Sequence, residues 1–182
     1  GELAPDSGTV TWEDTEIARI APAALARRRA VLPQASVLGF PLRAEAVVRL
    51  GRMPHAGRVT RAEDARAVAA AMRLAGVETL AQRIVQGLSG GEAQRVQLAR
   101  VLAQLHGTPT ERTALFLDEP TIGLDPAHAH AILRVAAERA RAGGIVVAVL
   151  HDLAAASRWC DRVAVMEGGR IVAHGPPEAV LD

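Results

Sequence analysis

One stretch, residues 88–125, constrains the fold of this chain more than any other. It begins with Leu-Ser-Gly-Gly-Glu-Ala-Gln-Arg, in which Ser89 precedes Glu92 by three residues. This is the capping-box spacing that marks the start of a helix. Gly90 and Gly91 leave the backbone open to close approach in the first turn. A helix N-terminus of this kind favours an anion, most often phosphate.

The same stretch contains a wholly apolar segment, residues 114–117, which ends at Asp118 and Glu119. Such a segment is typical of a strand that is buried on both faces of a parallel sheet. Ligands of open α/β sheets bind at the carboxyl ends of the strands. There Asp118 can hold Mg²⁺ on a nucleotide, and Glu119 can orient or deprotonate an attacking water. Each pattern alone has an ordinary structural explanation, a helix cap or a strand end.

Taken together, these patterns resemble the nucleotide-binding subunits of ABC transporters. Residues 88–95 resemble the signature motif of that family, residues 115–120 its Walker B strand, and Gly123-Leu124-Asp125 its D-loop. Many members have Ser-Ala-Leu-Asp at the D-loop, so Ile122-Gly123-Leu124-Asp125 is a mild departure. The resemblance covers nearly the whole chain.

Composition limits the alternatives. The chain has 182 residues, a formal net charge of +1, one cysteine and 2% aromatic residues. These values predict one domain or slightly more, no strong field for nucleic acid, and no internal disulfide. No apolar segment approaches the length of a membrane span, and the N-terminal residues do not form a signal peptide.

All 21 basic residues are arginine, so the sequence contains no G-x-x-x-x-G-K-[ST] phosphate loop. The resemblance therefore implies an ABC ATPase truncated at its N-terminus, without the Walker A loop, its strand or its helix. We expect a chain of this sequence to be inactive alone. The alternative is a degenerate member that never had the loop.

Two further site residues are implied by the resemblance. Gln34 follows the apolar segment Ala30-Val31-Leu32 and corresponds to the Q-loop residue, which contacts the metal or the attacking water. His151 follows the apolar segment 145–150 and corresponds to the switch histidine of the H-loop, which contacts the terminal phosphate. Without the resemblance, a glutamine in a loop is most often solvated, and a histidine after a strand is often a cap.

A narrower resemblance, to the ATPases of haem (hemin) importers, involves Phe40-Pro41 and Gly51-Arg52-Met53-Pro54-His55. Iron-siderophore and cobalamin importer ATPases share the Leu-Pro-Gln and Gly-Arg-x-Pro patterns. His55 and His174 are candidates for haem ligands, but isolated surface histidines are usually bystanders.

The intervening residues predict short helices over about 43–50, 60–74 and 77–82. Thr60 and Glu63 form a second capping box. An apolar helix face is predicted at Ala65, Val68, Ala69 and Met72. Elsewhere we expect strands at 9–12, 30–32 and 145–150, a hairpin at 163–173, and helices at 22–29, 90–105, 126–141, 153–159 and 176–181.

The predicted fold class is therefore α/β: a partial ABC-ATPase core sheet of the P-loop NTPase type with an inserted small helical subdomain. Residues 1–34 would form the core up to the Q-loop and residues 35–88 the helical subdomain. Residues 89–182 would form the core with the signature helix, Walker B strand, D-loop and H-loop.

The implied function is that of the ATP-hydrolysing subunit of a bacterial importer, of the hemin class. Its cofactors would be ATP and Mg²⁺. Its catalytic residues would be Glu119, His151 and Gln34; its metal-binding residues, Asp118 and Gln34; its nucleotide-binding residues, Ser89, Gly90, Gly91, Glu92 and Asp125. The partners implied are a second ATPase subunit, two permease subunits and, indirectly, a solute-binding protein, with no nucleic acid. The location would be the cytoplasmic face of the inner membrane.

Three alternatives remain open. The first is an iron-siderophore or cobalamin importer ATPase. The second is a soluble ABC ATPase of repair or translation, for which a long insertion between Gln34 and Ser89 would be expected, and none is present. The third is a non-catalytic interaction subunit that keeps every motif except the phosphate loop.

Overall fold

The computed structural model describes residues 4–34 and 39–181. Its centre is a three-stranded parallel sheet in the order β3-β4-β5, formed by Arg29–Leu32, Ala114–Asp118 and Ile145–Val149. The two crossovers between these strands contain helices, as parallel pairing requires. β4 is the central strand and buries Ala114, Leu115 and Leu117. The apolar segments of the sequence therefore predicted the sheet correctly.

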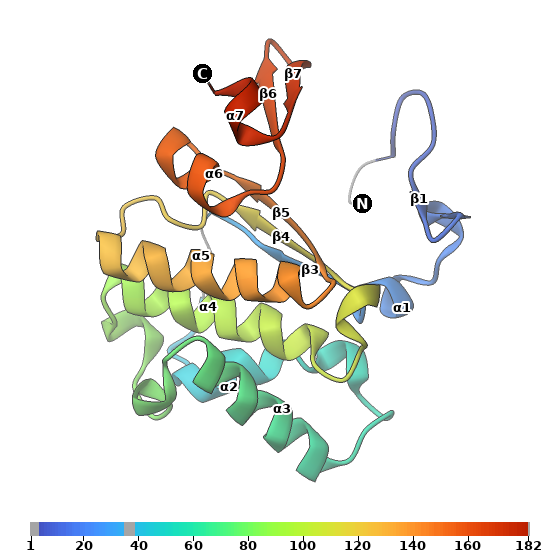
Figure 1. Ribbon diagram of the computed structural model, residues 1–182. Helices are drawn as coiled ribbons and strands as arrows, with labels where there is room; N and C mark the ends of the chain where they lie inside the picture. Colours follow the sequence, from blue (N-terminus) through green and yellow to red (C-terminus); the bar gives the residue numbers. More distant parts are fainter. Residues whose placement is uncertain (1–3, 35–38, 182) are drawn as a thin grey trace.

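Helices cover one face of this sheet in two layers (Figure 1). The layer next to the sheet contains α4 (Gly90–Leu105) and α5 (Pro126–Arg141), and the outer layer contains α2 (Ala44–Leu50) and α3 (Arg61–Leu74). α4 contacts β3, α2, α3 and α5, so it is the shared element of the core. Val96, Ala99 and Leu102 on α4 are buried.

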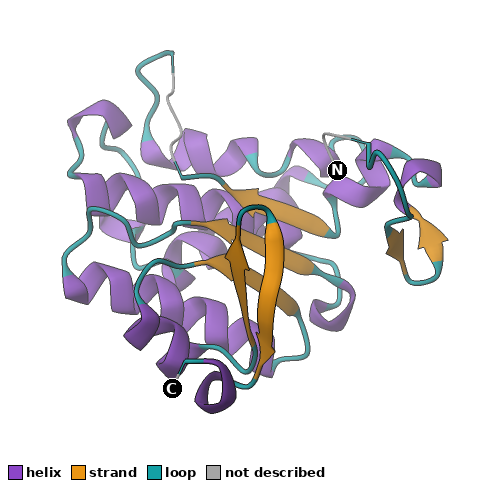
Figure 2. Cartoon of the chain, turned by 90° about the horizontal axis from the view of Figure 1, so that it is seen from above, coloured by secondary structure: helices purple, strands orange, loops and turns teal. Residues whose placement is uncertain are grey.

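Smaller elements complete the described chain (Figure 2). A hairpin of β1 (Thr11–Trp12) and β2 (Thr15–Glu16) precedes α1 (Pro22–Ala26), and a second hairpin joins β6 (Val163–Glu167) to β7 (Arg170–Gly175). α6 (Leu153–Trp159) follows β5, and α7 (Pro177–Val180) is the last helix. Both hairpins project away from the helical layers in Figure 1. No helix among the described residues has the length and apolar character needed to cross a membrane.

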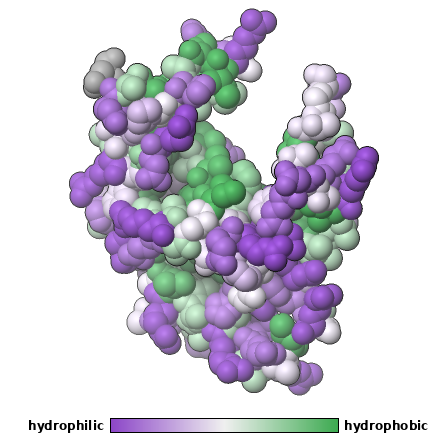
Figure 3. All heavy atoms as spheres, turned by 45° about the vertical axis from the view of Figure 1, so that its right-hand side comes forward, coloured by the Kyte–Doolittle hydropathy of each residue, from purple (hydrophilic) through white to green (hydrophobic). Residues whose placement is uncertain are grey.

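The side of the sheet without helices is partly open. On β5 the side chains of Ile145, Val147 and Val149 are 56%, 48% and 50% exposed, while Val146 and Ala148 pack against the core. β5 is also the edge strand of the described sheet. Apolar surface gathers in the opening between the two projecting parts of the molecule in Figure 3. This face of the described sheet therefore presents apolar side chains to solvent.

Three predictions about local structure were wrong. Residues 77–82 contain only a 3₁₀ turn, Glu78–Leu80. The segment is too short for a stable α-helix. α3 buries Ala67 and Ala71 with Val68 and Met72, whereas Ala65 and Ala69 are exposed. Alanine fits either face of a helix, so an alanine-rich pattern specifies the buried face poorly. The predicted helix at 22–29 ends at Ala26, because β3 already begins at Arg29.

Candidate functional site

Three predicted site residues meet at the carboxyl edge of the sheet. The register pairs Leu32 with Leu117 and Asp118 with Val149, so the three strands end side by side. Gln34 follows β3, Glu119 follows β4, and His151 follows β5. Residues that are 85 and 32 positions apart in sequence are therefore adjacent in space.

Glu119 is the centre of this group. Gln34 Nε2 donates a hydrogen bond to Glu119 Oε2 over 2.5 Å, and His151 Nε2 lies 2.5 Å from Glu119 Oε1. A carboxylate only accepts hydrogen bonds, so the contact from His151 places a proton on Nε2. The side chain of Glu119 is 18% exposed and that of His151 is 70% exposed. The carboxylate is thus oriented from both sides while the imidazole remains open to a ligand.

The backbone of Glu119 has a positive φ of 46°. Only two other described residues that are not glycine, Glu13 and Asp14 in the β1–β2 turn, have a positive φ. This conformation costs energy for an L-residue and often occurs where a site requires a particular side-chain direction. The sharp change of direction after Asp118 turns the Glu119 side chain toward Gln34 and His151.

Asp118 is the last residue of β4 and its side chain is exposed. Within the described part of the chain, no hydrogen bond or ion pair engages its carboxylate, and no cluster of three or more His, Cys, Asp or Glu residues could hold a metal alone. Mg²⁺ on a nucleotide usually takes only one or two protein carboxylates together with phosphate oxygens. An exposed aspartate at the end of β4 therefore fits this ion.

A second group surrounds the N-terminus of α4. Ser89 Oγ accepts a hydrogen bond from Glu92 N over 3.3 Å, and Ser89 N donates to Glu92 Oε2 over 2.9 Å, which is the predicted capping box. Arg83 forms an ion pair with Glu92 at 3.3 Å. The backbone N–H of Ser89 holds the pKa of Glu92 below its ordinary value. The carboxylate of Glu92 therefore fixes the position of Ser89.

Asp125 begins α5 in a similar way. Its Oδ1 accepts hydrogen bonds from Ala127 N and His128 N over 3.0 and 3.1 Å, and its Oδ2 contacts His128 Nδ1. The hydrogen bond from the side chain of His128 is the main cause of a lowered pKa at Asp125. The ring of His128 also packs on Gly91, so it joins the D-loop residue to the signature helix. The sequence analysis missed His128, although its i+3 spacing from a helix cap was a usable signal.

The two groups are separate in a single chain. No hydrogen bond or ion pair in the described structure joins Ser89, Glu92 or Asp125 to the group of Gln34, Glu119 and His151. The first turn of α4 nevertheless leaves space for a ligand, since a Cβ atom at Gly90 would meet no heavy atom within 4 Å.

The two histidines that were considered as haem ligands, His55 and His174, differ in their surroundings. His55 is 5% exposed and its Nε2 is 2.8 Å from the carbonyl oxygen of Gln104, so it is not a surface histidine as expected. Burial is the main cause of its lowered pKa. His174 is exposed on β7, with Arg162 as its neighbour. The two do not form a haem-binding pair, because one of them is committed to the protein interior.

Comparison with known proteins places this geometry in a family. The model of the ABC transporter family matches residues 1–122. The chain is 52% identical over its whole length to a hemin import ATP-binding protein of Nocardia farcinica and 50% identical to one of Pseudomonas putida. It spans 61% and 70% of the length of these two relatives.

Solved structures agree with this result. An ATP-binding subunit of an ABC transporter superposes with a TM-score of 0.78 at 28% identity, over 97% of this chain and 70% of that one. The cbiO1 protein of Clostridium perfringens, part of an ABC transporter complex, gives a TM-score of 0.78 at 26% identity, over 97% and 69%. The family match, the relatives and the fold lead to one conclusion: this chain belongs to the ABC transporter family.

Proposed function

We propose that this chain is the ATP-hydrolysing part of an importer subunit. The observation that carries the proposal is the meeting of Gln34, Glu119 and His151 at the carboxyl edge of the parallel sheet. A general base must lie within hydrogen-bond reach of the water it activates and must be held in orientation. Glu119 is oriented by two partners and lies one residue after Asp118, the proposed ligand of Mg²⁺.

Each residue then has a distinct role. Glu119 accepts the proton of the attacking water, and the exposed ring of His151 contacts the γ-phosphate. Gln34 donates to Glu119 through its nitrogen, which leaves its amide oxygen for the water or the metal. Bound Mg²⁺ would neutralise charge on the β- and γ-phosphate oxygens. Asp118 holds this ion in place at the strand end.

Two copies of the chain would complete the site. Ser89, Gly90 and Gly91 present an N-terminal helix turn to the ATP of the partner subunit, where backbone N–H groups and the helix dipole favour phosphate. Glu92 acts indirectly by fixing Ser89. Asp125 and His128 lie beside Gly91 and would cross the same interface. The division into a core and a helical subdomain at residues 34 and 88 is part of this proposal; the first residues after Gln34 lie outside the described structure.

The proposed solute is haem. Support comes from the relatives, which are named as hemin import ATP-binding proteins at about 50% identity. We also propose two permease subunits as partners and the inner face of the bacterial membrane as the location. The alternatives are an iron-siderophore or cobalamin importer ATPase and a soluble ABC ATPase. The buried His55 contributes nothing to solute recognition, which belongs to other subunits.

The extended chain allows tests of both the proposed ATPase activity and the proposed solute. The extended chain, in which a segment with a G-x-x-x-x-G-K-[ST] loop precedes Gly1, is compared with the printed 182-residue chain. We expect phosphate release from ATP at about 1 per second or faster for the extended chain only, since enzymes rarely work more slowly. Expression in a bacterium that lacks a hemin import ATPase should restore growth on hemin as sole iron source. Growth restored on a siderophore or cobalamin instead would reassign the solute.

A further inference from the structure

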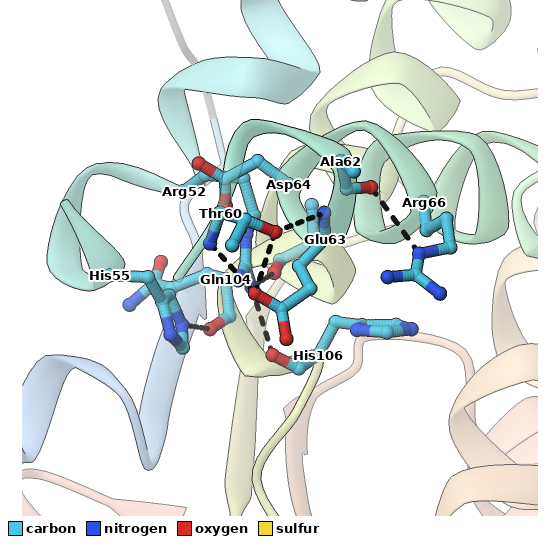
Figure 4. Close-up of polar contacts among 10 residues, drawn as sticks. Arg52, His55, Thr60, Ala62, Glu63, Asp64, Arg66, Gln104 and His106 are labelled. Atoms are coloured by element: carbon cyan, nitrogen blue, oxygen red, sulfur yellow. Dashed lines mark hydrogen bonds and ion pairs between the residues drawn. The ribbon is translucent and has the colours of Figure 1, made fainter. Parts of the chain in front are cut away.

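The segment Gly51-Arg52-Met53-Pro54-His55, here called the cap segment, has a structural role that the proposed function does not use. It follows α2 and lies against the C-terminal end of α4 (Figure 4). Arg52 and His55 are each 5% exposed. Buried arginine and histidine side chains need specific partners. Their partners include backbone carbonyls at and just after the C-terminal end of α4.

The C-terminus of α4 has an unusual requirement. The last four carbonyls of a helix receive no hydrogen bond from within the helix. A glycine after the helix, which lets the following N–H groups turn back, or a basic side chain in the last turn usually supplies the donors. The residue that follows α4, His106, has an extended backbone, and the last turn of α4 contains no basic residue. The backbone N–H groups of His106 and Thr108 donate to the carbonyl oxygens of Ala103 and Leu105 over 3.2 and 3.3 Å. The carbonyl oxygen of Gln104 and the second lone pair of Ala103 remain available for donors from outside the helix.

The cap segment supplies those donors. Arg52 Nη1 donates to the carbonyl oxygens of Ala103 and His106 over 2.7 and 2.9 Å, and His55 Nε2 donates to that of Gln104 over 2.8 Å. The positive guanidinium also lies at the negative end of the helix dipole. Arg52 Nε bonds to Asp64 Oδ1 on α3 over 2.8 Å, so one side chain joins α4 to the outer helical layer.

Gly51 allows the segment to approach this closely. A Cβ atom at this position would lie 2.1 Å from the carbonyl oxygen of Arg100, which no side chain could occupy without moving the backbone. The side chain of Gln104 extends the same junction, because its Nε2 donates to the carbonyl oxygens of Ala26 and Arg29 over 2.7 and 3.0 Å. Arg29 begins β3, the strand that leads to Gln34.

We propose that the cap segment clamps the C-terminal end of the signature helix to α2 and α3, and that Arg52 is the positioning residue for Ser89, Gly90 and Gly91 at the opposite end. This rests on the proposed role of those three residues toward a nucleotide. α4 has 16 residues. At about 1.5 Å per residue it is about 24 Å long, so a tilt of about 5° at the capped end displaces Ser89 by about 2 Å. A misplacement of about 1 Å can cost about 100-fold in a reaction that depends on geometry.

The test compares three variants of the extended chain. Arg52→Gln removes the charge and shortens the side chain, and Arg52→Lys keeps a charge without the planar fork. The control, Arg49→Gln, removes an exposed arginine in the last turn of α2 that forms an ion pair with Glu45. The first measurement is amide hydrogen exchange in the last turn of α4. We expect exchange at least about tenfold faster in Arg52→Gln, an intermediate value in Arg52→Lys, and no change in Arg49→Gln.

The second measurement separates positioning from general loss of structure. ATP affinity of the monomer should be unchanged in Arg52→Gln, because the phosphate loop is elsewhere, whereas ATP-driven dimerisation should weaken by about 10- to 100-fold. Equal exchange rates in Arg52→Gln and Arg49→Gln would overturn the proposal, as would faster exchange with undiminished dimerisation. If Arg52→Gln does not fold, Arg52→Lys decides by the same two measurements.

Failure of the proposed function would look different. If the unmodified extended chain does not dimerise with ATP, the nucleotide role of Ser89, Gly90 and Gly91 is wrong. The exchange comparison then still shows whether Arg52 holds the end of α4. A clamp without ATP-driven dimerisation would retain the structural part of this inference and overturn its link to the signature motif.

Discussion

A Cβ atom added to Gly91 would lie 3.0 Å from Cγ of His128, so the first turns of α4 and α5 pack directly on each other. His128 cannot retreat freely, because its ring is held by Asp125. Any side chain at Gly91 therefore disturbs the D-loop of its own chain. At Gly90 the corresponding space is open. These neighbouring glycines must be tested differently.

The first prediction concerns Gly90→Asp in the extended chain. A carboxylate about 4 Å from a phosphate charge near a protein surface opposes it by about 4 kcal/mol. We expect ATP-driven dimerisation to be lost while the monomer still binds ATP, as measured by light scattering and nucleotide titration. Gly87→Asp, at another glycine with open surroundings, is the control. Loss of ATP binding by the monomer would instead place the signature helix in the site of its own chain.

The second prediction concerns acid stability. Desolvation is the main cause of a lowered pKa at both His55 and His106, and the charge of Arg52 lowers both further. At His55 the hydrogen bond to the carbonyl of Gln104 and the charge of Asp64 oppose this shift, and the charge of Arg27 adds to it. In the unfolded chain both histidines titrate near about 6.5. The folded state therefore binds fewer protons than the unfolded chain. The stability that the neutral histidines contribute is fully present above that pH and is lost as the pH falls through the lower folded-state pKa.

Urea unfolding of the extended chain between pH 5 and pH 8 measures this loss. His55→Gln retains a donor for the carbonyl of Gln104 but cannot titrate, so the pH dependence should become smaller. His174→Gln, on the exposed surface of β7, should leave it unchanged. Stability that increases on acidification, or an equal slope in all three proteins, would contradict the assigned role of His55.

The third prediction concerns the exposed face of β5. Ile145, Val147 and Val149 are about half exposed, so each forfeits roughly half of the ~1.5–3 kcal/mol that full burial provides. Whole domains are stable by only about 5–15 kcal/mol. An open edge strand with an apolar face also pairs readily with other chains. We expect the 182-residue chain to aggregate or unfold partly, and the extended chain to be monomeric without ATP.

Size exclusion and thermal melting distinguish the two chains. The extended chain should elute as a single species and melt cooperatively. A monomeric 182-residue chain with a cooperative melt above about 45 °C, in the range of mesophilic domains, would show that β5 needs no further cover.

Sequence patterns predicted the parts of this fold that depend on neighbouring residues. The capping boxes at Thr60 and Ser89 are both present with reciprocal hydrogen bonds, because four adjacent residues are sufficient to form them. The strand ends were equally predictable from apolar segments that stop at Asp118 and His151. His55 was expected to be a surface histidine, but it is buried. The residues next to it in sequence do not indicate its burial.

Contacts between distant residues could not be predicted from pattern alone. The bonds from Arg52 to Ala103 and His106 join positions 51 and 54 residues apart. The positive φ of Glu119 arises from the way β4 turns at its end, and no residue preference indicates it. The resemblance placed Gln34, Glu119 and His151 in one site, but only the strand register explains how they meet.

The most direct test of the account is the hydrolysis rate of Glu119→Gln in the extended chain. The amide keeps the size of the side chain but cannot take the proton of the attacking water. Glu138→Gln, which removes an exposed carboxylate paired with Arg134, is the matched control. We predict that Glu119→Gln binds ATP and accumulates as a dimer while phosphate release falls by about 10²–10⁴-fold. Phosphate release equal to that of the control would show that Glu119 is only a strand-end acid and would contradict the proposed mechanism.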